Sequence, residues 1–185
     1  MLRFLSVGAL MLSSATAMAE GPSYSYIQGL YQEVDTDIGD GDGFAVAGSV
    51  EINESWFVFV DYGSAEIESI FDFDYNRWAV GGGWRSAISD KTDWFVTASY
   101  ADAELSAGGG SVSESGIGAS LGVRSMINPK LELAGSVVYS DPEEETGIRA
   151  EIWYTVTGNL AIGAQATFGD EIDILGAGIR LYFDK

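Results

Sequence analysis

The stretch Asp173-Ile-Leu-Gly-Ala-Gly-Ile-Arg-Leu-Tyr-Phe183 alternates between two kinds of side chain. One face is wholly apolar and consists of Leu175, Ala177, Ile179, Leu181 and Phe183. The opposite face carries small residues together with Arg180 and Tyr182. A period of two predicts a β-strand. An apolar face backed by a small and polar face is typical of a membrane barrel, in which lipid meets the apolar side and the lumen takes the other.

Nine earlier stretches repeat this alternation, and short connections follow several of them. They are residues 24–34, 43–52, 56–63, 75–86, 94–103, 114–125, 131–140, 147–157 and 160–168. Together with the last stretch they predict an all-β fold, an up-and-down antiparallel transmembrane β-barrel of ten strands closed by its final strand. A barrel of eight strands is the alternative. An even number of strands places both chain ends on the periplasmic side.

The connections and the aromatic residues support this prediction. Short turns are expected at 53–55 and 158–159 and a longer one at 87–93, whereas long loops are expected at 35–42 and 65–74. Aromatic residues fall on the outward face near both ends of the strands, as in the aromatic belts of membrane barrels. The belt near the loops consists of Tyr31, Phe44, Tyr62, Trp78, Tyr100, Tyr139 and Phe168, and the belt near the turns of Trp56, Trp84, Trp94 and Phe183.

Every arginine after residue 19 falls on the predicted inner face: Arg77, Arg85, Arg124, Arg149 and Arg180. An arginine facing lipid at the middle of the bilayer costs about 2–4 kcal/mol. Four carboxylates share the inner face and can pair with the arginines: Glu51, Asp61, Glu132 and Glu151. These nine residues are expected to form an interior charge network, which either packs the lumen or lines a narrow aqueous path.

The first 19 residues predict a secretory signal peptide followed by a barrel domain over residues 20–185. Met1-Leu-Arg3 is a short basic start, an apolar run extends from Phe4 to Met11, and Ala17-Met18-Ala19 matches a cleavage motif. Export to the outer membrane is therefore expected. No later segment is apolar for long enough to form a transmembrane helix.

The composition argues against catalysis and against nucleic acid as a partner. The chain has no histidine and no cysteine, which excludes Ser-His-Asp catalysis, most zinc sites and disulfides. Its net charge of −19 disfavours binding to phosphate backbones. We therefore expect no enzyme activity and no organic cofactor.

Acidic residues gather in the expected loops, and the first loop is the candidate metal site. It contains Asp35, Asp37, Asp40 and Asp42, separated by glycines that let the backbone fold around an ion. Calcium and magnesium prefer several oxygen ligands. The spacing does not match an EF-hand, and a flexible, solvated acidic rim is the alternative to a specific site.

Three short stretches carry a family resemblance. The opening Ser23-Tyr-Ser-Tyr-Ile-Gln-Gly-Leu-Tyr31, the later Asp42-Gly43-Phe44 and the final Gly178-Ile-Arg-Leu181-Tyr-Phe183 resemble small outer-membrane β-barrel proteins of Gram-negative bacteria, the OmpA/OmpX-like and porin-family barrels. The last motif is similar to the signal read by the barrel assembly machinery, although Gly176 replaces a usual polar residue and Asp184-Lys185 follow the aromatic. The resemblance implies three partners: outer-membrane lipid, lipopolysaccharide and the assembly machinery.

Two functions remain open from the sequence. The first is a non-enzymatic barrel with a structural or surface-interaction role, whose acidic loops hold divalent cations. The alternative is a narrow, weakly cation-preferring channel of the porin type.

Overall fold

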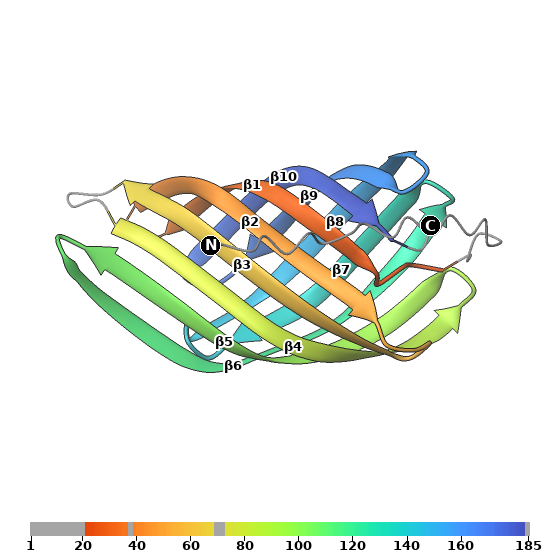
Figure 1. Cartoon of the computed structure of the whole chain (residues 1–185), viewed down its shortest axis with the longest axis horizontal. Helices are drawn as coiled ribbons and strands as arrows, with labels where there is room; N and C mark the ends of the chain where they lie inside the picture. The colour runs from red at the N-terminus through yellow and green to blue at the C-terminus, as the bar shows by residue number, and fades with distance from the viewer. Residues whose placement is uncertain (1–20, 37–38, 69–72, 184–185) are drawn as a thin grey trace, which may run out of the picture.

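The computed structural model describes residues 21–36, 39–68 and 73–183, which form one closed sheet (Figure 1). Its strands are β1 (Tyr26–Thr36), β2 (Gly39–Glu51), β3 (Trp56–Glu68), β4 (Phe73–Ser89), β5 (Thr92–Ala107), β6 (Gly110–Asn128), β7 (Leu131–Ser140), β8 (Glu145–Thr157), β9 (Leu160–Phe168) and β10 (Ile172–Tyr182). Each strand pairs antiparallel with its neighbours in the sequence, and β10 pairs with β1. The ten-strand barrel is confirmed, and the eight-strand alternative is wrong.

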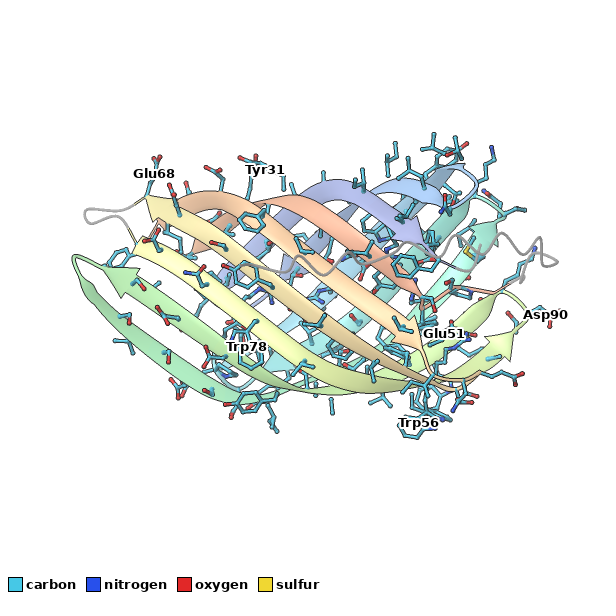
Figure 2. The ribbon with its side chains drawn as sticks, viewed as in Figure 1. Tyr31, Glu51, Trp56, Glu68, Trp78 and Asp90 are labelled. Carbon is cyan, nitrogen blue, oxygen red and sulfur yellow. The ribbon has the colours of Figure 1, made fainter. Side chains whose placement is uncertain are left out.

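The predicted signal peptide lies outside the described residues. Within them, no helix is long and apolar enough to cross a membrane. Short turns and the last described residue, Phe183, lie at one end of the barrel, which we call the turn end; the opposite end is the loop end (Figure 1). Figure 2 shows Asp90 at the turn end and Glu68 at the loop end.

The middle of the barrel follows the predicted alternation. On β3, the outward side chains of Val58 and Val60 are about half exposed, at 45% and 53%. The inward side chain of Phe57 on the same strand is 6% exposed. Leu30 also points inward, as its register requires. The outward apolar residues form a continuous belt around the molecule, which we call the apolar band.

Several strands run further than the sequence predicts. Strands β4, β5 and β6 contain 17, 16 and 19 residues, although about 9–11 residues are enough to cross a bilayer. The expected loops at 35–42 and 65–74 were wrong in large part, because pairing continues to Thr36↔Gly39 and Ile67↔Phe73. The expected turn at 87–93 was too long, since Asp90 and Lys91 alone join β4 to β5.

The extended ends of β1 to β6 form a second zone, which we call the acidic wall (residues 33–36, 39–43, 64–68, 73–76, 102–107 and 110–117). The β5–β6 hairpin projects furthest, past the turn between β7 and β8 (Figure 1). It closes on Gly108 and Gly109, whose φ angles of 57° and 93° suit glycine. Strand β6 meets β7 only from Gly118 onward, so the wall stands on one side of the barrel.

The two zones have opposite polarity. In the acidic wall, carboxylates occupy the outer face of successive strands, with Glu33 opposite Asp42, Asp42 opposite Glu66, and Glu66 opposite Asp74. The inner face there is mainly apolar and is buried at its base, since Val34 and Ile67 are each 4% exposed. In the apolar band the outer face is apolar, and the inner face carries the arginines.

Candidate functional site

The turn half of the lumen contains a buried ion network centred on Arg180 of β10. Its Nη1 lies 3.0 Å from Glu132 Oε1 and its Nη2 lies 2.8 Å from Glu151 Oε2. Its Nε and Nη2 donate to Gln28 Oε1 at 2.9 and 2.6 Å. Arg124 Nη2 approaches the same Glu132 oxygen at 2.6 Å. Two arginines therefore share one carboxylate.

Aromatic rings enclose this network. The Arg180 guanidinium lies 4.0 Å from the Trp153 ring centroid and 4.2 Å from that of Tyr26. Trp153 Nε1 donates to Glu151 at 2.9 Å, and Tyr182 Oη donates to Glu132 at 3.2 Å. Burying charges is costly unless they are paired and hydrogen-bonded. Here every charge has both kinds of partner, so the network fills its side of the lumen as a rigid plug.

Tyr24 fills the other side of the lumen at the turn end. It precedes β1 and is 2% exposed, with its backbone N–H donating to Glu51 at 2.9 Å. Its ring lies 4.3 Å from the Arg124 guanidinium and 4.8 Å from that of Arg85, and it packs 4.6 Å from the ring of Phe57.

Arg85 fixes this corner by pairing with two carboxylates. It lies 3.2 Å from Glu51 and 2.7 Å from Asp93. The roles of Tyr24 and Asp93 were not predicted from the sequence. The pattern predicts a strand that begins at Tyr24 and a turn that ends at Asp93, although the parity of Tyr24 with Tyr26 already indicates an inward side chain.

The loop half of the lumen is less tightly filled. Among the described residues, neither Arg77 nor Arg149 has a carboxylate oxygen within 4.0 Å. Arg149 Nε donates to Thr167 Oγ1 at 3.2 Å. Two adjoining cavities of about 160 and 140 Å³ share Asp61, Arg77 and Arg149 in their walls.

The larger of these cavities is polar. Tyr24 Oη, Gln32 Nε2 and Ser49 Oγ have no hydrogen-bond partner among the described residues, and all three residues line it. Water occupies about 30 Å³ per molecule in the liquid, and buried polar groups that lack protein partners commonly bind it. Together the two cavities, which we call the chamber, are therefore large and polar enough for several water molecules.

Glu143, in the turn between β7 and β8, lines the smaller of the two cavities, on the loop side of the chamber. Tyr75 Oη donates to its carboxylate, and Arg77 lies nearby. Burial would raise the pKa of Glu143, but the charge of Arg77 and the hydrogen bonds from Ser140 and Tyr75 outweigh burial and lower the pKa. The carboxyl is therefore ionised near neutral pH. This role of Glu143 was not predicted from the sequence.

The nine residues of the predicted charge network therefore fall into three groups. Arg124, Arg180, Glu132 and Glu151 form the central plug; Arg85 and Glu51 form the corner at Tyr24; Arg77, Arg149 and Asp61 line the chamber. The first two groups fill most of the turn half of the lumen, and the third lines the chamber, which reaches from the loop end down to Tyr24.

Three of the four predicted metal ligands, Asp35, Asp40 and Asp42, lie on strands rather than in a loop. Asp35 is paired in β1, opposite Asp40 of β2, and Asp42 lies opposite Glu33. Asp37 falls outside the described residues. In the part of the chain that the structure describes, no group of three acidic residues is close enough to hold a metal ion. A cation site that includes Asp37 stays a prediction.

Comparisons with known proteins place the fold. No family model and no curated protein matches the sequence. A structure of KdgM porin in complex with disordered oligogalacturonate matches with a TM-score of 0.52 and 9% identity, over 83% of this chain and 98% of that chain. The outer membrane protein OprG from Pseudomonas aeruginosa matches with a TM-score of 0.50 and 11% identity, over 86% and 95%. The chain has the fold of outer-membrane β-barrel proteins.

A third outer-membrane barrel shows how far the likeness extends. Ail, the attachment invasion locus protein of Yersinia pestis, is 20% identical over 84% of this chain and 95% of that chain, with a TM-score of 0.41. At these identities the shared property is the fold. The outer-membrane barrel fold that the sequence resemblance implies is confirmed by the closed ten-strand sheet and by the likeness to KdgM and OprG.

Proposed function

We propose that this protein is a non-enzymatic barrel of the outer membrane, exported by its signal peptide, that anchors an acidic wall at the cell surface. The observation that carries the proposal is the acidic wall. It continues the strands of the barrel, so its carboxylates sit on a hydrogen-bonded sheet and keep fixed spacings.

The apolar band supports the membrane location. Outward residues such as Tyr31, Val80 and Ile179 are 57%, 50% and 57% exposed. A continuous belt of exposed apolar side chains is unusual on a monomeric soluble protein and suits contact with lipid. The turn end then faces the periplasm, and the acidic wall faces the outside.

The acidic wall would concentrate cations. Like charges directly opposite each other on neighbouring strands destabilise a sheet, and Glu33, Asp42, Glu66 and Asp74 form such a row. Divalent cations relieve this repulsion and can be shared with lipopolysaccharide phosphates. Calcium or magnesium at the wall is therefore part of the proposed role.

Calcium-dependent stability tests the role of the wall. In lipid nanodiscs, millimolar calcium should raise the unfolding temperature by about 2–4 °C, which corresponds to about 1 kcal/mol for a chain of this size. The double variant Asp42→Asn/Glu66→Gln should lose most of this shift. The matched control Glu54→Gln/Asp90→Asn removes the same charges at the turn end and should keep it. Equal calcium shifts in both variants would refute a role for the wall.

A narrow cation channel is the second candidate. The two charged cavities of the loop half support it, because they reach from the loop end down to Tyr24. The plug argues for a closed lumen. Arg180 and Glu132 in the plug, and the rings of Trp153 and Tyr182 that enclose it, are all nearly inaccessible to solvent. Current across a planar bilayer distinguishes the two. We expect no current from protein that is shown by other means to be inserted. A steady, stepwise, cation-preferring current would replace our proposal with the channel.

A further inference from the structure

The inner face of the acidic wall encloses a separate cavity of about 510 Å³ at the loop end. Small-molecule sites usually measure about 300–1,000 Å³ and are mainly apolar. The apolar residues lining this cavity are Val34, Ile67, Leu105, Val112, Pro142 and Ile172. They come from five strands and from the turn between β7 and β8, so the closed sheet holds the cavity in shape.

The cavity has a buried base and an exposed apolar side. Val34 and Ile67 are each 4% exposed, whereas Leu105 and Val112 are 36% and 77% exposed. Leu105 and Val112 are register partners on the projecting β5–β6 hairpin. Both belong to the inward-facing set of their strands, and both line the cavity. A ligand in the cavity would therefore remove apolar surface from water, which is favourable.

The charges around the cavity are all negative. Glu104, Glu114, Glu143 and Glu171 line it, and no lysine or arginine of the described residues does. The outer face of the same wall adds further carboxylates, and charges of one sign around a low-dielectric cleft concentrate ions of the opposite sign. The cavity is thus complementary to a molecule with an apolar body and a positively charged end.

We propose that this cavity binds small amphiphilic ammonium compounds, with the apolar body against Val34, Ile67, Leu105 and Val112 and the cationic end toward the glutamates. This function goes beyond the surface role proposed above. It requires neither calcium on the outer face nor conduction through the lumen.

Three probes matched in carbon chain test the site: hexylammonium, hexan-1-ol and hexanoate. Binding to the full barrel in lipid nanodiscs can be followed by NMR through the methyl signals of Val34, Ile67, Leu105 and Val112, with empty nanodiscs as the blank for partitioning into lipid. We expect hexylammonium to bind roughly tenfold more tightly than hexan-1-ol, a difference of about 1.4 kcal/mol. Hexanoate should bind most weakly, and high salt should reduce the preference for the cation.

Two sets of variants separate the apolar and the charged contributions. Leu105→Ser/Val112→Ser should weaken binding of hexylammonium and hexan-1-ol about tenfold, because the methyl groups that the probes cover are gone. Both residues are exposed, so the barrel should still fold. Glu114→Gln/Glu171→Gln should remove the preference for hexylammonium and leave hexan-1-ol binding unchanged. Glu66→Gln, on the outer face of the wall, is the matched control and should leave the order of the probes unchanged.

Three results would overturn the proposal: no methyl shifts with hexylammonium, equal binding of hexanoate and hexylammonium, or insensitivity to both sets of variants. These results differ from failure of the proposed surface role, which the calcium experiment reports without any organic probe.

Discussion

The apolar band and the acidic wall lie on the same strands and have opposite polarity. Along β3, Val58 and Val60 face outward and Asp61 faces the lumen; a few residues later Glu66 faces outward and Ile67 is buried inside. The alternation of the strand continues without a break, because β3 keeps its pairing with β2 and β4 throughout. A period of two therefore defines two faces, and the chemistry of each face shows whether lipid or water surrounds it.

The two interiors are stabilised differently as a result. Inside the apolar band, Arg124, Arg180 and Glu132 form ion pairs with full hydrogen bonding. Inside the acidic wall, Val34 and Ile67 form the apolar packing expected of a water-soluble barrel. The wall should thus behave like a small soluble domain carried by a membrane protein, and the following substitutions test this difference.

The largest effect should come from Glu132 in the plug. Glu132→Gln leaves two buried arginines without their shared carboxylate, and breaking a buried pair costs about 3–5 kcal/mol. Urea unfolding of the barrel in lipid vesicles measures this loss. Glu54→Gln, an exposed change at the turn end, is the control and should cost almost nothing. A loss below 1 kcal/mol for Glu132→Gln would mean that the network does not stabilise the plug.

An outward arginine should distinguish the two zones. Val80→Arg lies in the apolar band and should cost about 2–4 kcal/mol, whereas Glu68→Arg on the wall should stay within about 0.5 kcal/mol. Unfolding from lipid vesicles reports both values. The inward substitution Gly81→Arg cannot serve as a control for Val80→Arg, because any Cβ at position 81 would collide with the backbone oxygen of Ala98. Equal losses at positions 80 and 68 would contradict the assignment of the two zones.

A smaller effect should follow from removing one methyl group. Ile67→Val leaves a gap inside the wall and should cost about 0.5–1.5 kcal/mol. Ile179→Val on the apolar band should cost less, because lipid chains fill the space. The two variants can be compared in the same urea titration. A larger loss at Ile179 would show that the wall interior is not a packed core.

The smallest effect should be a pH dependence from Glu143. Its folded pKa lies below its ordinary value of 4.5, so its stabilisation is present above that value and is lost as the pH falls through the folded pKa. The wild type should exceed Glu143→Gln in stability at pH 7, and the difference should shrink below about pH 4.5. Exposed Glu144→Gln serves as the control. A difference independent of pH would show that the charge of Glu143 is not responsible.

Sequence patterns were sufficient for the apolar band. They predicted ten strands, the bounds of β7 and β9, and the inward direction of all five arginines. Each of these follows from alternation within one strand, which a single sequence displays.

The acidic wall and the plug could not be predicted in the same way, because they depend on pairing and contacts with other strands, which the pattern of a single strand does not show. Asp40, Gly41 and Asp42 carry the composition of a turn, and pairing with β1 and β3 overrides this preference. Tyr24 lies in a pocket built by Phe57, Arg85 and Arg124, which come from three other strands. Glu143 lies in the turn between β7 and β8, where side chains do not alternate between two faces, so the sequence pattern does not predict its direction.

The outer face of β3 changes from apolar to acidic along its length, and spin-label accessibility can locate this change. The chain contains no cysteine, so single cysteines can be introduced at outward positions 58, 60, 62, 64, 66 and 68 and labelled in lipid vesicles. We predict contact with oxygen dissolved in lipid at 58 and 60, contact with a water-soluble relaxation agent at 66 and 68, and a crossover near 62–64. Lipid contact along all six positions, or water contact at 58 and 60, would contradict the account.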